Sequence, residues 1–172
     1  EKSQLYDANL QYANLCFAKL QNANLCFAEL QNVDLSEAEL QNAHLREANL
    51  QNATLWFVKL QNAKLLRAEL QNANLSRAKL QHADLSRAKL QNAELRECDL
   101  SWRQLEKVKD GDLTGSKITE NDFKNKIYPK WKAETDSEWE ALTEGERMTA
   151  MQKFHGETGV CIYDKARNQI IP

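Results

Sequence analysis

Leucine recurs at every fifth residue over most of the chain, from Leu5 to Leu105 without interruption. A step of five residues turns an α-helix by about 500°, so these leucines would be spread around the whole circumference of a helix. On a flat β-strand the same step places successive leucines on opposite faces, and half of them would point into solvent. The pattern therefore predicts a coil that turns a corner every five residues and directs each leucine inward.

A second inward position lies two residues before each leucine. Alanine occupies sixteen of the twenty-one such positions from 3 to 103, and the other residues up to position 98 are small or compact: Ser3, Val33, Val58 and Cys98. A large side chain at this position would collide with the neighbouring layer of leucines. The exception is Arg103, close to the point where the period changes.

The register of the repeat shifts after Leu105. Asp110 stands at the next leucine position, and the period resumes three residues later at Leu113, Ile118 and Phe123. The small positions of these last repeats are Gly111, Ser116 and Asn121. We expect a bulge between residues 106 and 111, followed by three further repeats.

Segments such as Ala13-Asn14-Leu15 and Ala83-Asp84-Leu85 share the motif Ala-(Asn or Asp)-Leu followed by two variable residues. This motif closely resembles that of the pentapeptide-repeat family, over about 120 of the 172 residues. The resemblance implies an all-β solenoid, a right-handed quadrilateral β-helix with four five-residue sides and twenty residues per coil. In that geometry residues 1–124 form the β-helix, with about six coils.

Glutamine follows every second leucine of the repeat, from Leu10 to Leu90. In a twenty-residue coil these glutamines stack in two columns on opposite sides of the solenoid. Because coils stack about 4.8 Å apart, we expect the amides to hydrogen-bond to one another up each column. Duplication of a ten-residue unit accounts for the same pattern, with the amide ladders as a by-product.

Residues 125–172 lose the five-residue period, which predicts a separate C-terminal cap. Ser137 and Glu140 match a capping box, and Gly145 is a candidate helix break, so the region is expected to hold one kinked helix or two short ones. An extended tail over residues 160–171 is expected to lie along the rod. Since the end of a solenoid exposes unpaired strand edges and uncovered core, the small α-helical cap would cover the last coil.

The sequence argues against catalysis, cofactors and metals. All five glycines lie at or beyond position 111, which excludes a phosphate-binding glycine loop from the repeats. The four cysteines show no C-x-x-C spacing and are expected to be unpaired thiols, and the three histidines occupy unrelated positions. With no run of eighteen apolar residues, we expect no membrane insertion.

Outward positions after the other leucines carry variable residues that form a candidate partner surface. Phe17, Trp56 and Phe57 fall on one side of the coil, and Phe27 and Leu66 on the opposite side. A basic band between residues 64 and 89 adds Arg67, Arg77 and Arg87. The apolar residues are either a binding surface or partly covered by their neighbours, and the basic band is either a binding site or a solvated face.

We therefore predict a non-enzymatic binding or scaffold protein with a protein partner, and do not expect nucleic acid as a ligand. One alternative, implied by family members that resemble DNA and protect DNA gyrase, is a DNA-mimicking modulator of gyrase. That role requires an acidic rod, whereas residues 1–123 hold 17 acidic and 15 basic residues. Another is an end-to-end self-assembling rod, or a homodimer through a solenoid end, because no cap precedes Leu5.

The compartment stays open at this stage. The net charge of −2 does not indicate a compartment, and the chain begins at Glu1. The chain is expected to be cytoplasmic, or periplasmic or thylakoid lumenal if a signal peptide has been removed before Glu1. The abundance of such repeats in cyanobacteria implies a bacterial, cyanobacterial source.

Overall fold

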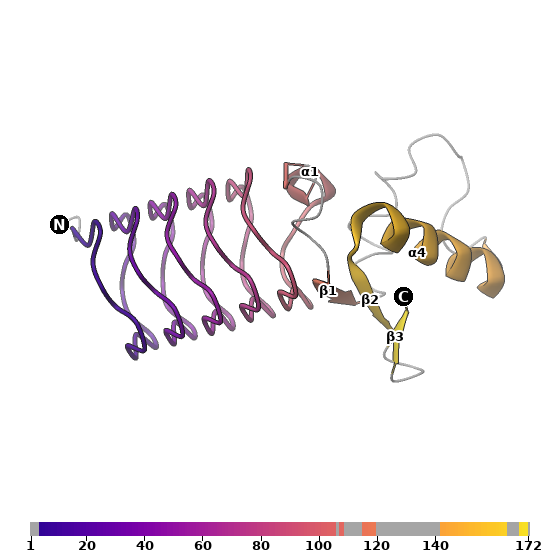
Figure 1. The fold of residues 1–172 in the computed structure, drawn as a ribbon, viewed down its shortest axis with the longest axis horizontal. Coiled ribbons are helices and arrows are strands. Elements are labelled where there is room, and N and C mark those ends of the chain that lie inside the picture. The colour runs from indigo at the N-terminus through magenta and orange to yellow at the C-terminus, as the bar shows by residue number, and fades with distance from the viewer. Residues whose placement is uncertain (1–3, 106, 109–114, 120–141, 165–168, 172) are drawn as a thin grey trace.

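The chain winds into a rod of stacked coils, with a helix and a small sheet at the end away from the N-terminus (Figure 1). The computed structural model describes residues 4–105, 107–108, 115–119, 142–164 and 169–171. Isolated parallel bridges join residues twenty apart, beginning with Gln4 to Asn24 and ending with Asn74 to Glu94. Each bridge is made by the residue just before a leucine, so one coil has four sides of five residues, as predicted.

Three backbone hydrogen bonds per repeat hold successive coils together. The N–H of Leu25 donates to the carbonyl of His44 over 2.7 Å, the N–H of Phe27 donates to Arg46 over 3.0 Å, and the N–H of Asn49 donates back to Ala28 over 3.0 Å. The same three bonds recur along the rod. Each strand segment is so short that its pairing is a single bridge between two turns.

Every corner is a tight turn with a left-handed residue. The N–H of Ala28 donates to the carbonyl of Leu25 over 3.2 Å, and the second of the two turn residues has a φ between 54° and 63° at all nineteen corners from Asp7 to Glu97. This geometry is that of a type II turn, which favours Asn or Gly at the second position. Asparagine occupies seven of the nineteen positions, from Asn22 to Asn92.

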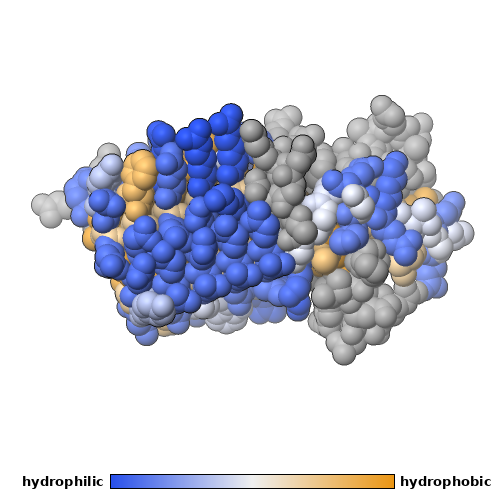
Figure 2. All heavy atoms as spheres, in the orientation of Figure 1, coloured by the Kyte–Doolittle hydropathy of each residue, from blue (hydrophilic) through white to orange (hydrophobic). Residues whose placement is uncertain are grey.

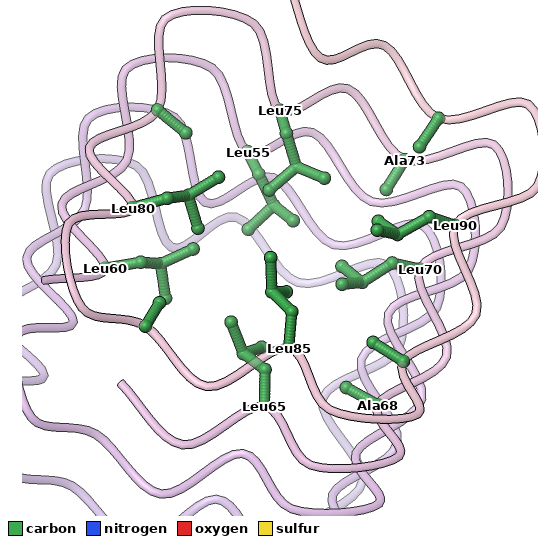
Figure 3. Packing of buried hydrophobic residues seen from close by; sticks show 14 of the residues in the cluster. Leu55, Leu60, Leu65, Ala68, Leu70, Ala73, Leu75, Leu80, Leu85 and Leu90 are labelled. Atoms are coloured by element: carbon green, nitrogen blue, oxygen red, sulfur yellow. The ribbon is translucent and has the colours of Figure 1, made fainter. Parts of the chain in front are cut away.

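The core is a stack of leucine layers. The leucines at every fifth position from Leu25 to Leu95 are at most 1% exposed, and the alanines from Ala23 to Ala93 at most 4%. Figure 3 shows leucines of all four sides pointing to a common centre, with Leu55 below Leu75 and Leu65 below Leu85. Both inward positions are therefore confirmed.

The regular repeat ends one side earlier than predicted. Residues Trp102–Leu105 form the short helix α1 in place of another coil side. The amide of Gln104 donates to the carbonyls of Leu80 (2.6 Å) and Ala83 (3.1 Å), so it takes over part of the bonding of the missing strand. A residue as large as Arg103 does not suit the tight inward position, which accounts for the change.

The three-residue shift of register is confirmed. Glu94 bridges Lys117, twenty-three residues on, at the start of β1 (Lys117–Thr119). Ser116 and Ile118 take the small and the large inward positions, at 0% and 1% exposure. Leu113, Phe123 and most of the expected bulge lie outside the described residues, so the number of coils stays a prediction.

The C-terminal tail extends one face of the rod. Strand β2 (Cys161–Asp164) pairs in parallel with β1, and β3 (Gln169–Ile171) pairs antiparallel with β2. Because β1 also bridges Glu94, β2 follows it as the next rung of the same ladder. The tail is extended as expected, but the prediction that it runs along the rod is wrong: its strands stack beyond the last coil.

Helix α4 (Glu144–Thr158) precedes this tail. Thr143 is its N-cap, and a capping box joins Thr143 to Glu146. The helix runs through Gly145, so the predicted break there is wrong, while the predicted capping box at Ser137 lies outside the described residues, as does the boundary at 124. Met151 and Phe154 of α4 belong to the same buried apolar cluster as the leucines.

Candidate partner-binding surface

The structure divides the predicted surface between two opposite corners of the coil. We call the turn residues after Leu15, Leu35, Leu55, Leu75 and Leu95 the aromatic corner. Those after Leu5, Leu25, Leu45, Leu65 and Leu85 form the opposite corner. The aromatic corner holds four predicted residues: Phe17, Trp56, Phe57 and Arg77. The opposite corner holds the other four: Phe27, Leu66, Arg67 and Arg87.

Three predicted residues on the aromatic corner are in contact. The rings of Trp56 and Phe57 meet edge to face with centroids 4.3 Å apart, and the Cζ of Arg77 lies 5.3 Å from the centroid of Phe57. The guanidinium of Arg77 also binds the carboxylate of Glu97, with an Nε to Oε2 distance of 2.7 Å. We call these four residues the Trp56 cluster. Trp56 is 38% exposed, so the cluster is partly ordered by its own contacts yet accessible.

Phe17 is separate from the Trp56 cluster. Glu37 lies between Phe17 and Phe57 in the same column, so the two phenylalanines are about 10 Å apart along the rod. Phe17 is 66% exposed and shares the first coil with Tyr6 and Tyr12. The sequence reasoning missed both tyrosines, although they occupy the same outward turn positions as the residues it selected.

Three of the six basic residues in the predicted band, Arg67, Arg77 and Lys89, pair with carboxylates. On the opposite corner Arg67 lies 3.4 Å from Glu47, and on one flat side Lys89 lies 2.6 Å from Glu69. Leu66 is half-buried, and Arg87 is exposed. Exposed pairs of this kind contribute little stability, but they cancel the local charge. The pairing favours a solvated face over a basic binding site.

The glutamine columns form, but the prediction of bonds between their amides is wrong. Among the described residues some glutamine amides donate instead to carboxylates: Gln51 to Glu69 over 2.7 Å and Gln81 to Asp99 over 2.6 Å on the next coil, and Gln31 to Glu29 over 2.5 Å on its own coil. A carboxylate is a stronger hydrogen-bond acceptor than an amide oxygen, so the glutamine N–H groups bind the carboxylate in preference to another amide. An amide pair does occur one position on, where Asn72 donates to Asn52 over 3.2 Å.

Aspartates before two leucines fix the following turns. The carboxylate of Asp84 accepts from the hydroxyl of Ser86 (2.5 Å) and from its N–H (3.1 Å), and Asp34 binds Ser36 in the same way. These hydrogen bonds, led by that from the serine hydroxyl, lower the pKa of both carboxyl groups. A hydrogen bond to Asp34 raises the pKa of the Cys16 thiol.

The remaining candidate chemistry is sparse. All four cysteines are free, and the Cys98 thiol is buried and donates to the carbonyl of Leu95. Within the described residues no group of three or more His, Cys, Asp or Glu side chains is placed to hold a metal ion. None of the helices in the described segments has the length and apolar character that a membrane crossing requires.

An open groove lies beside the opposite corner of the rod, and none of the eight predicted residues lines it. Its volume is about 500 Å³. Asparagines at one left-handed turn column form one wall, and the outward strand column beside it forms the other. The lining residues are Gln4, Asn22, Asn24, Asn42, His44, Asn62 and Lys64.

Two sequence families match this chain. The family described as "Pentapeptide repeat region" matches residues 28–105, and that described as "Pentapeptide repeats (8 copies)" matches residues 8–46. The chain belongs to the pentapeptide-repeat family, whose members form right-handed quadrilateral β-helices. The twenty-residue ladder and the leucine core are those of this fold. A search of the curated proteins found no significant match.

Several solved structures are similar to this chain. A pentapeptide-repeat protein from the thylakoid lumen of Arabidopsis thaliana is 23% identical, with a TM-score of 0.56 over 60% of this chain and 74% of that one, and this likeness concerns the fold alone. A pentapeptide-repeat protein from Nostoc is 31% identical, with a TM-score of 0.46 over 64% and 84%. QnrB1, a plasmid-mediated fluoroquinolone resistance protein, is 19% identical, with a TM-score of 0.43 over 74% and 76%.

Proposed function

We propose that this chain is a non-enzymatic solenoid that binds a protein partner through the Trp56 cluster. The main support for this proposal is the contact among Trp56, Phe57 and Arg77 on one exposed corner. Tryptophan and arginine are enriched among the residues that dominate binding energy at protein interfaces. The cluster offers two apolar rings packed edge to face and flanked by a guanidinium, which suits a protein surface with both apolar and acidic groups.

The backbone conformation at Phe57 and Arg77 supports a functional role for their side chains. Phe57 and Arg77 have φ values of 54° and 60°, at the turn position where asparagine stands on seven other corners. Bulky residues in the left-handed region carry backbone strain, and such strain is concentrated at functional sites. The rigid coil beneath holds the side chains in place before binding, which lowers the entropy lost when a partner docks.

Charge distribution favours a protein partner over the DNA-mimic alternative. Along the rod, Lys59 pairs with Glu39 at 2.8 Å and Arg77 with Glu97 at 2.7 Å, so basic and acidic groups occur together within the columns. An imitation of DNA would need an unbroken acidic stripe, because duplex DNA carries a negative charge about every 1.7 Å. The basic residues within these columns support a mixed, protein-like surface.

We also propose that residues 125–172 cap a rod of about six coils. In support, β2 pairs with the strand that bridges Glu94, and the rings and thioethers of α4 reach the leucine cluster. A cap of this kind would cover apolar core and strand edge at the C-terminal end.

A capture experiment in extract of the native host tests the binding proposal. The variant Trp56→Ser, Phe57→Asn, Arg77→Asn removes the cluster, and asparagine relieves strain at both turn positions, so its melting temperature should not fall below that of the wild type. A protein bound by the wild type should be depleted at least about tenfold from the variant, in line with the loss of several interface anchors. Quantitative mass spectrometry of the captured proteins provides the readout.

The matched control is Leu66→Ser with Arg67→Asn, at the same turn positions of the opposite corner. It should capture the same protein as the wild type. Equal capture by all three forms, or loss with the control alone, would contradict the assignment of the binding face to the Trp56 cluster.

A further inference from the structure

The open groove of about 500 Å³ is distinguished by polar side chains that have no partner. Hydrophilic side chains cover most of the rod face shown in Figure 2, so polarity alone does not set the groove apart. Five of its lining side chains, however, make no hydrogen bond or ion pair with the described part of the chain: Asn22, Asn42, Asn62, His44 and Lys64. Free donors and acceptors gathered in one hollow are available to a ligand.

At the other asparagine corner, half a coil away, several equivalent side chains are already engaged. Asn72 donates to Asn52 over 3.2 Å. In the strand position beside that corner, Glu94 forms an ion pair with Lys117 at 2.6 Å. The groove is therefore a place where the same repeat geometry leaves its polar groups unpaired.

The asparagine wall repeats its chemistry once per coil. Asn22, Asn42 and Asn62 stand twenty residues apart at the left-handed turn position, with φ values of 60°, 59° and 59°. Because the backbone conformation recurs, equivalent atoms of these residues lie about 4.8 Å apart along the rod, the spacing of paired strands. Each side-chain amide can both donate and accept, as a hydroxyl group does. The wall suits an elongated ligand that carries hydroxyl groups at each coil.

The other wall gives the groove positive charge. His44 and Lys64 stand at the same outward strand position on successive coils, and none of the described residues that line the groove is acidic. Asp84, next along this column, accepts from the hydroxyl of Ser86 over 2.5 Å. A lysine ammonium binds a carboxylate through a charge-assisted hydrogen bond. The ligand should therefore carry a carboxylate beside its hydroxyl groups.

The coil spacing separates the classes of elongated ligand. An extended peptide brings side chains to one face about every 6.7 Å, so it falls out of step with coils about 4.8 Å apart. A nucleic acid strand is held through several phosphate contacts, and a single lysine supplies one. A β-1,4-linked sugar chain adds one hydroxyl-bearing ring over nearly the length of one coil step. Its acidic forms also carry a carboxylate on each ring.

We propose that this groove binds a short acidic oligosaccharide, a β-1,4-linked chain of uronic acid residues. The rings lie along the groove, with their hydroxyl groups hydrogen-bonded to the amides of Asn22, Asn42 and Asn62. A carboxylate accepts from the ammonium of Lys64, beside the ring of His44. This inference does not rest on the Trp56 cluster, and no residue of that cluster lines the groove.

Nuclear magnetic resonance titration of the 172-residue chain tests the site, with the β-1,4-linked hexamer of mannuronic acid as the probe. The side-chain amide signals of Asn22, Asn42 and Asn62 should shift as the hexamer is added, with a Kd of about 0.1–1 mM. Cellohexaose, the neutral chain with the same linkage, should bind at least about tenfold more weakly, because it has no carboxylate for Lys64. Free mannuronic acid should bind more weakly still, since one ring reaches only one coil.

Two variants with matched controls locate the contacts. Lys64→Gln should weaken binding of the acidic hexamer about tenfold, while Lys79→Gln, at the same strand position on another side, should leave it unchanged. Asn42→Asp adds a negative charge inside the groove and should also weaken binding about tenfold. Asn32→Asp makes the same change at the turn half a coil away and should have no effect. Aspartate tolerates the left-handed turn, so both aspartate variants should fold.

Absence of asparagine amide shifts with the acidic hexamer at about 5 mM would overturn the proposal, because the free energy of such weak binding is too small for a specific site. Equal binding of cellohexaose would refute the carboxylate contact, and with it the acidic class of ligand. Equal binding of free mannuronic acid would show a simple anion site in place of an oligosaccharide groove. Equal losses in the variants and their controls would place the contacts elsewhere on the rod.

Discussion

At the scale of single residues, the second turn position joins fold stability to surface chemistry. All nineteen described corners hold this residue at a φ of 54–63°, and the conformation is the same for asparagine, phenylalanine, glutamate and arginine. Asparagine tolerates the left-handed region better than the other side chains. At each corner where another residue replaces asparagine, that residue therefore carries some backbone strain in the left-handed turn.

Glu37→Asn isolates this effect, because Glu37 is exposed and has a φ of 56°. We expect the variant to be more stable by about 0.5–1 kcal/mol, since asparagine lowers the strain of the left-handed turn. The reciprocal change Asn42→Glu, at a φ of 59°, should destabilise by a similar amount. Thermal unfolding followed by circular dichroism measures both; equal melting temperatures for all three forms would show that the turn carries no strain.

The inward residues could be predicted from sequence because spacing alone fixes them. A five-residue period leaves no other direction for Leu60 or Ala73, and both are buried as expected. The turn type could not be obtained in this way, since the period counts residues and not dihedral angles. The asparagine that follows most of the glutamines in the repeat does indicate a left-handed turn residue. The repeated glutamine instead led to the prediction of amide ladders, and the acidic acceptors on the next coil were not recognised.

At the scale of elements, the aspartate that precedes a leucine acts as a cap for the turn that follows. Asp84 accepts two hydrogen bonds from Ser86, and Asn74 accepts one from the N–H of Ser76 at 3.0 Å. The side chain thus satisfies a backbone donor that the turn leaves free. Aspartate and asparagine serve this role equally in geometry, but only aspartate makes it depend on pH.

The pKa of Asp84 is lowered from 3.8, first by the hydroxyl of Ser86, so the unfolded chain takes up the proton before the folded one does. The stability contributed by Asp84 is therefore complete well above pH 4 and is lost as the pH falls through the folded-state pKa. Asp84→Asn should reduce the drop in melting temperature between pH 5 and about pH 2.5, and Asn74→Asp should increase it. Parallel acid profiles for the three forms would contradict this account.

The C-terminal elements could not be predicted from local sequence patterns alone. Ser137 with Glu140 and Thr143 with Glu146 both fit a capping box, and nothing in either four-residue window identifies the second as the start of α4. Gly145 lies in the first turn, where its conformational freedom costs little helix stability. The pairing of β1 with β2 joins Lys117 to Cys161, a contact between distant segments that periodicity does not encode.

At the scale of the whole molecule, the solenoid places the Trp56 cluster on one corner, partway along the rod. Sequence spacing divided the five apolar candidate residues between opposite sides, as the structure does, but it grouped the three arginines as one band and could not tell which residues meet. Contacts between Phe57 and Arg77 depend on the coil spacing and on side-chain direction at the turn, which only the structure supplies.

The measurement that tests the central claim most directly is position-specific photo-crosslinking in the native host. A benzophenone amino acid at Trp56 is compared with the same probe at Leu66, the matched turn position of the opposite corner. The account predicts a discrete adduct with one protein from position 56 and none from position 66. An adduct from position 66 alone, or from neither position, would contradict a binding face at the Trp56 cluster.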